Sequence, residues 1–263
     1  EQFHYNNNPH LSEFTGFSID VSEAQAKQML TGQLIAVAAD AEGNIVDSTR
    51  VQIPRVLDYL YTRTDNDANE AKLGVDYSND SVTASVWAPT AQSVTLKVYN
   101  KAKALQNTYP MILDSDTGIW RHTGEKATLD RQFYRYELSV YHPLTQNIEL
   151  VETTDPYSIS LSRNGRFTQF VNLDDADLKP AGWDTHVVPA AKDPEDIIIY
   201  ESHIRDFSIL DESTSAEHRG KYMAFTELNS APVQHLQSLQ RAGLTHFHML
   251  PANDIATIRE DEQ

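Results

Sequence analysis

The stretch DIIIYESHIRDFSI, residues 196–209, decides the fold, together with PVQHLQSLQRAGL (232–244) and THFHMLP (245–251). Ile197 to Tyr200 form a β-branched, apolar run too short for a helix, which is typical of a strand buried on both faces of a parallel sheet. In the second segment apolar residues recur every three positions and Gly243 follows at the C-cap, which predicts a helix with one buried stripe. The third segment is another apolar run. Strand, helix and strand in this order predict a right-handed parallel β-α-β unit.

The composition excludes several classes of partner and chemistry. The 263 residues contain 21 Lys plus Arg against 38 Asp plus Glu, a formal charge of −17 that disfavours nucleic acid and anionic lipid surfaces. No apolar run approaches the roughly 20 residues of a membrane span, and the first residues, EQFHYNNNPH, have no targeting signal. The absence of cysteine excludes disulfides, zinc-thiolate sites and thiol nucleophiles, but is compatible with either a cytosolic or a secreted protein.

Residues 1–62 are predicted to form a small α+β accessory domain with no chemistry of its own. The pattern predicts a helix at 22–30 with Ser22 as N-cap, strands at 33–39 and 45–53, and a short helix at 56–61. A polar segment, TRTDNDANEAK, follows at 62–72 and is interpreted as a linker.

Residues 73–184 are predicted to form an all-β sandwich. Apolar residues alternate through a series of strands without intervening helices. The predicted strands are Val82–Val86, Val94–Val98, Ile112–Trp120, Phe133–Tyr141, Ile148–Glu152 and Phe167–Val171, with separating turns at Asp116-Thr117-Gly118 and at residues 143–147. A loop rich in proline then precedes Ile197, which places a second domain boundary near residues 184–194.

Aromatic residues are dense in the predicted sandwich. They are Trp87, Tyr99, Trp120, Phe133, Tyr134, Tyr136, Tyr141 and Tyr157. Exposed aromatic rings would stack on the apolar face of a sugar ring, whereas buried rings would only fill the core. The core interpretation is favoured for most of them, and Trp87 in particular is expected in the core.

A cluster of polar side chains lies at or just past the end of the first strand of the β-α-β unit. Alternation along an extended chain would place Glu201, His203 and Arg205 on one side and Asp206 on the other. Such a set could serve in acid/base chemistry, or it could be a buried ion and hydrogen-bond cluster with only a structural role. The structural interpretation is favoured.

The second strand contains an H-x-H pair, His246 and His248, with both rings on one side. Metal-dependent hydrolases use this spacing on barrels, with further ligands from later strands, but structural histidines are the favoured interpretation. Asp254 follows in a loop where a substrate contact is conceivable and a solvated side chain is the default. No Ser-His-Asp triad, dinucleotide fingerprint or P-loop occurs, and no carboxylate pair can be placed as glycoside hydrolysis requires.

Motifs in three separate regions of the chain carry a family resemblance. They are LGVDYSNDSVTASVWAPTAQSVTLKVYN (73–100), FYRYELSVYHPLTQNIELVETTDPYSISLSRNG (133–165), and IYESHIRDFS, RGKYMAFTE and GLTHFHMLPANDIATI between 199 and 258. Together they resemble the bacterial type I pullulanases, debranching members of the α-amylase superfamily. The resemblance identifies residues 1–62 with an accessory domain and 73–184 with a sandwich of carbohydrate-binding family 48. It identifies 195–263 with the start of a catalytic (β/α)8 barrel of which only strands 1 and 2 are present.

The resemblance implies hydrolysis of α-1,6-glucosidic bonds in pullulan and branched starch, with retention of configuration. The family's nucleophilic aspartate and its general-acid glutamate lie on the fourth and fifth barrel strands, so no catalytic residue can be assigned in this chain. Substrate-binding residues and metal ligands are likewise unassigned. The family needs no cofactor for its chemistry, and a structural calcium ion would be consistent with it.

The implied partners are an α-glucan (pullulan, amylopectin or limit dextrin) and the remainder of the same enzyme, which would complete the barrel, if need be as a second chain. The chain alone is expected to be inactive. The alternative function is a non-catalytic module for α-glucan binding or interaction. The resemblance favours an extracellular or cell-surface location over a cytoplasmic one.

Overall fold

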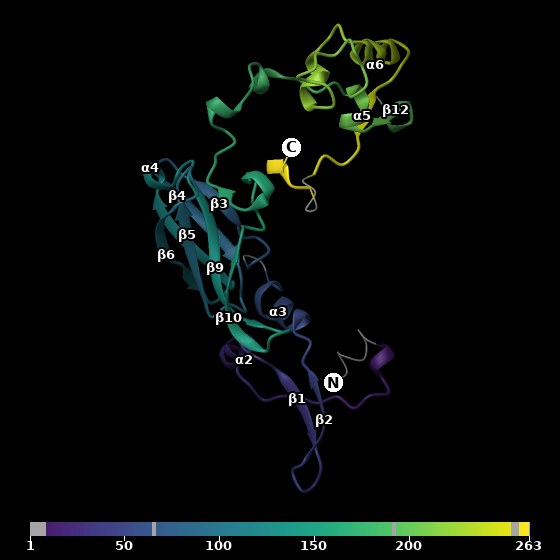
Figure 1. The fold of residues 1–263 in the computed structure, drawn as a ribbon. Coiled ribbons are helices and arrows are strands. Elements are labelled where there is room, and N and C mark those ends of the chain that lie inside the picture. The colour runs from purple at the N-terminus through teal and green to yellow at the C-terminus, as the bar shows by residue number, and fades with distance from the viewer. Residues whose placement is uncertain (1–8, 65–66, 191–192, 254–257, 263) are drawn as a thin grey trace. The chain divides into compact units, whose positions relative to one another are not determined.

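The computed structural model describes residues 9–64, 67–190, 193–253 and 258–262. The chain divides into two compact units, Glu1–Asn172 and Leu173–Gln263. Figure 1 colours the first unit from purple to teal and the second from green to yellow.

The first unit begins with short elements at the positions predicted from the sequence. A 3₁₀ turn at Pro9–Leu11 and α2 (Glu23–Met29) precede the antiparallel strands β1 (Ile35–Ala39) and β2 (Ile45–Arg50), and α3 (Pro54–Tyr61) follows. Ser22 caps α2 as predicted, because its Oγ accepts the backbone N–H of Gln25 at 3.3 Å while the Gln25 side chain accepts the N–H of Ser22 at 2.9 Å. Every residue of the two strands is exposed.

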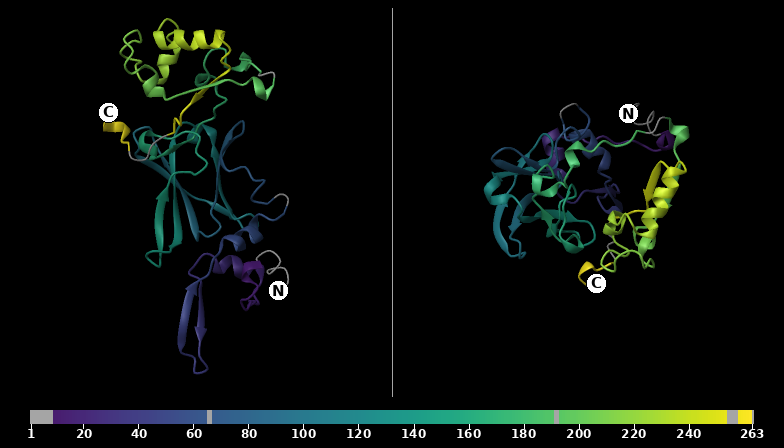
Figure 2. Two further views of the ribbon diagram at one scale, coloured as in Figure 1. Left: turned by 90° about the vertical axis from the view of Figure 1, so that its right-hand side faces the viewer. Right: turned by 90° about the horizontal axis from the view of Figure 1, so that it is seen from above.

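Two antiparallel sheets follow and confirm the predicted all-β domain. One sheet has the order β3 (Gly74–Tyr77), β4 (Ser81–Trp87), β8 (Ile119–Glu125) and β7 (Ile112–Asp114). The other has the order β10 (Asn147–Thr153), β9 (Phe133–His142), β5 (Ser93–Tyr99) and β6 (Leu105–Pro110), and the short β11 (Thr168–Gln169) pairs with the start of β9. The helical turn α4 (Lys126–Leu129) follows β8. Figure 2 shows the strands of the two sheets on opposite sides of the sandwich.

The segment predicted as strand at Ile112–Trp120 is divided at the turn signal that it contains, Asp116-Thr117-Gly118. The segment contains two strands, β7 and β8, which pair with each other across a tight turn. Gly118 in this turn has φ +70°, and a Cβ at that position would lie 2.7 Å from the Cβ of Pro89. The positive φ and the close approach to Pro89 both favour glycine at this turn. The strands β3 and β6 were not predicted.

Residues from both sheets fill the core of the sandwich. The alternation of Val82 with Ala84 and of Val94 with Leu96 places these side chains inside, each at most 2% exposed. The other members of the cluster are Val86, Ala91, Val98, Met111, Trp120, Leu129, Tyr134, Tyr136 and Phe170. Burial of this apolar surface is the main stabilising contribution to the sandwich.

The helix α3 contacts the sandwich through Tyr61, which is 4% exposed and packs with Ile119 and Trp87. Lys27 of α2 adds a polar contact, because its Nζ donates to the carbonyl oxygen of Ser115 at 2.9 Å and lies 4.9 Å from the centre of the Tyr61 ring. The N-terminal helices are therefore attached to the turn between β7 and β8.

The second unit contains the β-α-β arrangement predicted from the sequence. The strands β12 (Ile199–Ser202) and β13 (His246–Met249) pair in parallel, and α5 (Ile204–Ser208) and α6 (Ala231–Arg241) lie between them in the chain. In Figure 1 these helices and β12 are grouped in the second unit. Its 3₁₀ turns are Ala176–Leu178, Trp183–Thr185, Pro194–Asp196, Tyr222–Thr226 and Glu260–Glu262, and the first unit has another at Arg163–Gly165.

The predicted burial of the first parallel strand is not found in this chain. Ile197, Ile198 and Ile199 are 38%, 53% and 61% exposed, and Tyr200 is 36% exposed. Parallel strands are buried when further strands flank them and helices cover both faces. Among the described residues, β12 has β13 as its one paired strand, so its apolar side chains lie open.

Candidate functional site

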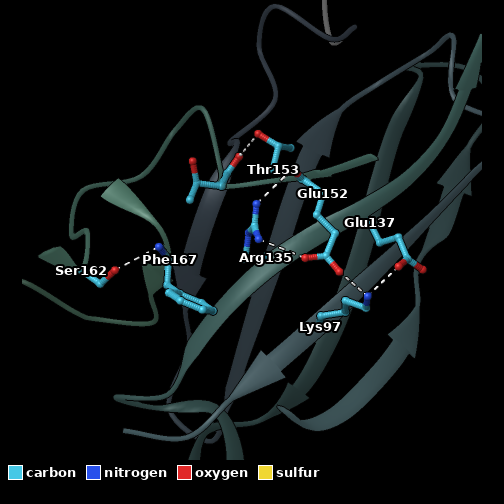
Figure 3. Close-up of polar contacts among 8 residues, drawn as sticks. Lys97, Arg135, Glu137, Glu152, Thr153, Ser162 and Phe167 are labelled. Carbon is cyan, nitrogen blue, oxygen red and sulfur yellow. Dashed lines mark hydrogen bonds and ion pairs between the residues drawn. The ribbon is translucent and has the colours of Figure 1, made fainter. Parts of the chain in front are cut away.

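The solvent-facing side of β5, β9 and β10 carries a charged network, which we call the outer face. Lys97 on β5 lies between two glutamates: its Nζ is 2.5 Å from Oε2 of Glu137 and also pairs with Oε1 of Glu152. Arg135 holds the other side of Glu152, with Nη1 3.0 Å from Oε2 and Nη2 donating to the Glu152 carbonyl oxygen at 3.1 Å. Figure 3 shows this chain of contacts.

The strand register explains the network. Lys97 lies opposite Arg135, and Glu137 lies opposite Glu152, so all four side chains share one side of the sheet. Hydrogen bonds to Glu137 and then Glu152 raise the pKa of Lys97 above its usual value, so the ammonium stays charged. The outer face is thus a polar surface with fixed charges, able to hydrogen-bond the hydroxyls of a ligand.

Three aromatic rings extend the outer face toward the turn between β5 and β6. Tyr99 and Phe167 meet edge to face with ring centres 4.9 Å apart, and Phe133 lies 6.5 Å from Phe167. The Nζ of Lys103 lies over the Phe133 ring, and burial lowers the pKa of Lys103. The backbone N–H of Phe167 donates to Oγ of Ser162 at 3.0 Å, which fixes the loop that presents the ring. All three rings are half-buried.

The other aromatic candidates divide between core and surface. Trp120, Tyr134 and Tyr136 are buried, at 7%, 0% and 0% exposed, so they cannot stack on a sugar. Trp87 is half-buried, packs against the Tyr61 cluster and donates from Nε1 to the Thr117 carbonyl oxygen at 3.0 Å. Tyr141 is half-buried and Tyr157 is 43% exposed.

A buried carboxylate beneath this sheet was missed by the sequence reasoning. Asp155 is 3% exposed, and its Oδ2 accepts the hydroxyls of Tyr134 at 2.7 Å and Tyr136 at 3.0 Å. Its Oδ1 accepts the N–H of Tyr157 at 2.8 Å, and its own N–H donates to Oγ1 of Thr168 at 2.9 Å. Burial raises the pKa of Asp155 despite these hydrogen bonds. Asp155 therefore fixes the segment after β10 against β9, and with it the outer face.

The polar cluster in the second unit is arranged differently from the prediction. The extended chain ends at Ser202, and His203 becomes the N-cap of α5 by accepting the N–H of Arg205 on Nδ1 at 3.2 Å. Arg205 and Asp206 are neighbours in that helix and pair with each other at 3.3 Å. The predicted sidedness of His203, Arg205 and Asp206 is wrong, because a helical turn replaces the alternating strand.

The parallel strands β12 and β13 bring a carboxylate and an imidazole together. Glu201 lies opposite His248 in the register, and Oε2 of Glu201 is 2.8 Å from Nδ1 of His248. Both side chains are more than half exposed, so the pair contributes little to stability. Nδ1 of His246 lies 2.9 Å from Oγ1 of Thr245, while Asp254 lies outside the described residues.

No group of three or more His, Cys, Asp or Glu side chains that could hold a metal ion is found in the part of the chain that the structure describes. That part therefore offers His246 and His248 no third ligand of these types. In the same described part, no helix is long and apolar enough to cross a membrane.

Family comparisons agree with this architecture. Residues 72–158, which hold most of the sandwich, match the family Carbohydrate-binding module 48 (Isoamylase N-terminal domain), and residues 3–59 match the Pullulanase N2 domain. The sandwich is thus a carbohydrate-binding-type module preceded by an N2 domain. The resemblance seen in the sequence motifs is confirmed, and the chain belongs to the pullulanase family.

Individual relatives match almost the whole chain. It is 41% identical to a pullulanase of Klebsiella pneumoniae, and the match covers 96% of this chain and 23% of the relative. It is 37% identical to the chloroplastic pullulanase 1 of Arabidopsis thaliana, and that match covers 97% of this chain and 26% of the relative. A crystal structure of the Klebsiella pneumoniae pullulanase complexed with maltotriose matches with a TM-score of 0.91 and 39% identity, over 100% of this chain and 25% of that one. The chain thus spans about a quarter of the length of these pullulanases.

Proposed function

We propose that this chain is part of a debranching enzyme that hydrolyses α-1,6-glucosidic bonds in pullulan and branched starch. The observation that carries the proposal is the similarity to pullulanases over 96% of the chain, including the N2 domain and the sandwich. The catalytic carboxylates would lie outside this chain. The chain itself would supply the accessory domain, the sandwich and the first strands of the catalytic domain.

We further propose that β12, α6 and β13 begin a (β/α)8 barrel. Two features support this. The two strands are parallel, and parallel sheets occur almost only where helices cover both faces. Ile198 and Ile199 are more than half exposed, so the strands have apolar surface that further strands and helices would cover. A barrel takes about 250 residues, far more than this unit has, so the remainder of the enzyme would be the partner that completes it.

The experiment is a comparison of the complete protein with this chain on pullulan, measured as the release of reducing ends. The proposal expects release by the complete protein and none by the 263-residue chain alone. Absence of release by a folded complete protein would refute the enzymatic proposal. Release by the isolated chain would refute the assignment of the catalytic groups to other parts of the enzyme.

A second candidate function, α-glucan binding by the sandwich, is favoured by the outer face. Tyr99, Phe133 and Phe167 provide aromatic surface beside the charged side chains of Lys97 and its partners. A sugar ring has an apolar C–H face and hydroxyls at its edges. Aromatic rings next to hydrogen-bonding groups can therefore bind both parts of it.

Affinity electrophoresis in soluble starch tests the second function. We expect retardation of the chain, and a smaller retardation of Phe167→Ala. Phe17→Ala is the matched control, because Phe17 is 90% exposed and distant in sequence from the outer face. Circular dichroism would verify that Phe167→Ala is folded. Equal retardation of Phe167→Ala and the unaltered chain would exclude the outer face as the binding site.

An extracellular or cell-surface location is also proposed, because the sequence motifs resemble those of the secreted members of the family. Immunodetection on intact and on lysed cells would test it. Signal from intact cells or from the medium is expected, and signal that appears only after lysis would contradict the proposal.

A further inference from the structure

The hairpin of β1 and β2 in the N2 domain is a two-stranded sheet whose residues are all exposed (Figure 1). Among the described residues, β1 pairs with β2 alone. A two-stranded hairpin is only marginally stable in water, and it gains stability when a further strand pairs with it or its apolar face is covered. The hairpin therefore has a free strand edge and an uncovered face.

The register of the hairpin shows which backbone groups lie at the free edge of β1. The N–H of Val51 donates to the carbonyl oxygen of Leu34 at 3.1 Å, so Leu34 directs its backbone groups toward β2. Residues that bond to the partner strand alternate with residues that do not, so Ala36 and Ala38 also bond to β2. The residues between and after them direct their N–H and C=O groups to the free edge, and these are Ile35, Val37 and Ala39.

The outward-bonding residues also share one apolar face of the hairpin. Side chains alternate along a strand, so residues 35, 37 and 39 lie on one side of β1, and Ile45 joins them because it pairs with Ala39. Ile35, Val37 and Ile45 are 47%, 52% and 69% exposed. The opposite face is small or polar, with Ala36, Ala38, Asp47 and Thr49. A strand that pairs with the free edge would therefore extend an apolar face as well.

The hairpin is held in place at its turn and at its base. At the turn, Oδ1 of Asp40 accepts the N–H of Asn44 at 2.8 Å and Oδ2 accepts its Nδ2 at 3.0 Å. At the base, Nη2 of Arg50 donates to the carbonyl oxygen of Pro143, in the turn after β9, at 2.5 Å. The edge of β1 is thus preformed, which lowers the entropic cost of pairing with it.

We propose that the free edge of β1 pairs with the same edge of a second copy of the protein, antiparallel about a two-fold axis at Val37. In this register Val37 lies opposite the partner's Val37, and Ile35 lies opposite the partner's Ala39. Every outward N–H of one β1 then meets an outward carbonyl oxygen of the other. The two hairpins join into one sheet, and their apolar faces become continuous.

The charge distribution favours a second copy of β1 as the occupant of this edge. β1 contains no charged residue, so pairing it with itself brings no like charges together although the protein has a formal charge of −17. Asp40, just past β1, would fall opposite the partner's Leu34 and not opposite another carboxylate. β2, in contrast, carries Asp47 and Arg50, and charged side chains protect a strand edge from pairing.

The test is analytical ultracentrifugation of the complete protein over a range of concentrations. We expect a reversible equilibrium between monomer and dimer in the micromolar range, because an edge of five residues is short for a specific interface. The complete protein is used so that the exposed apolar residues of β12 in the shorter chain add no association of their own.

Charge substitutions at Val37 test the register. In Val37→Lys and in Val37→Asp like charges meet at the two-fold axis, so each variant alone should dimerise at least about tenfold more weakly than the unaltered protein. An equimolar mixture should dimerise at least about tenfold more tightly than either variant, because lysine then lies opposite aspartate. Ile112→Lys is the matched control, since Ile112 is 78% exposed on β7, an edge strand of the sandwich, and it should leave dimerisation unchanged.

Amide hydrogen exchange of β1 gives an independent measurement. The N–H groups of Ile35, Val37 and Ala39 should exchange more slowly as the protein concentration rises through the dissociation constant of the dimer. The N–H groups of Ala36 and Ala38 already bond within the hairpin, so their exchange should depend less on concentration. The opposite ranking of the two sets would contradict the proposed edge.

The inference is overturned if the complete protein is a monomer at about 100 µM. It is also overturned if Val37→Lys dimerises as tightly as the unaltered protein, or if the mixture dimerises no better than either variant. Dimers of the 263-residue chain alone, with a monomeric complete protein, would show that the rest of the enzyme covers this edge and would overturn it too. Hydrolysis of pullulan by a monomeric complete protein would overturn the dimer and leave the debranching proposal intact, so the two failures are distinguishable.

Discussion

Replacement of Asp155 should destabilise the first unit strongly. In Asp155→Ala the hydroxyls of Tyr134 and Tyr136 lose their acceptor, and both residues are 0% exposed, so water cannot replace it without disturbing the core. The N–H of Tyr157 loses its acceptor as well. Each buried polar group left without a partner costs about 1–3 kcal/mol. We expect the free energy of unfolding to fall by about 3–5 kcal/mol, because some local relaxation will reduce the sum.

The assay is urea unfolding followed by tryptophan fluorescence. Trp87 and Trp120 lie in the first unit and Trp183 in the second, so Trp183→Phe provides a background in which the signal reports the sandwich. The double replacement Tyr134→Phe with Tyr136→Phe removes the two orphaned hydroxyls. In the variant that carries both Tyr→Phe replacements, Asp155→Ala should lower the free energy of unfolding by at least about 2 kcal/mol less than it does in the chain that keeps both tyrosines. An equal cost in both backgrounds, or a cost below about 1 kcal/mol alone, would refute the reasoning.

The same residue predicts a pH dependence. Burial raises the pKa of Asp155 above its usual 3.8. The folded chain therefore binds this proton more tightly than the unfolded chain does. The stabilisation of the fold by protonation is complete below pH 3.8 and is lost as the pH rises through the raised pKa. Compared with Asp155→Asn, the unaltered chain should gain relative stability as the pH falls toward 4, measured by urea unfolding at a series of pH values. A relative loss over this range would contradict the raised pKa.

Three further changes test other parts of the first unit. Gly118→Ala should lower the free energy of unfolding, measured with urea, by about 2 kcal/mol more than Gly43→Ala does. Both positions have positive φ, but only a Cβ at Gly118 would meet Pro89 and the Tyr61 ring. Equal losses for the two variants would contradict the steric argument. Ser22→Ala should cost about 1 kcal/mol and speed amide hydrogen exchange in α2, whereas unchanged exchange would show that the capping box contributes nothing. Lys97→Met should cost about 1–2 kcal/mol near neutral pH, since Glu137 and Glu152 lose a shared cation. Because the pKa of Lys97 is raised above its usual 10.5, the stabilisation by the charged ammonium is fully present below pH 10.5. It is lost as the pH rises through the raised pKa. A decrease of the Lys97 contribution to stability that begins near neutral pH would contradict this.

The sequence predicted the elements whose pattern is local. The alternation of Val82 with Ala84 and the capping signal at Ser22 each depend on a few neighbouring residues, and both are found in the structure. The parallel pairing of β12 with β13 followed from general rules of chain connection. The turn signal Asp116-Thr117-Gly118 was present in the sequence, but the close approach of Gly118 to Pro89 could not be predicted from it, because it joins residues 29 positions apart.

The candidate sites depended on contacts that sequence spacing does not contain. The network of Lys97, Glu137 and Glu152 requires the register of three strands, and each residue alone reads as an ordinary solvated charge. Alternation misplaced Arg205 because the strand ends at Ser202 and a helix starts with His203 as its cap. A signal for Asp155 was present in the resemblance, since the D-P-Y sequence at 155–157 is one of its motifs, but its tyrosine partners could not be inferred from it.

The most direct test of the central claim is the identity of the products that the complete protein releases from pullulan, separated by chromatography. Cleavage of α-1,6 bonds predicts maltotriose as the end product. Trisaccharides that retain an α-1,6 bond would show cleavage at α-1,4 positions instead, and would contradict the assignment of this chain to a debranching enzyme.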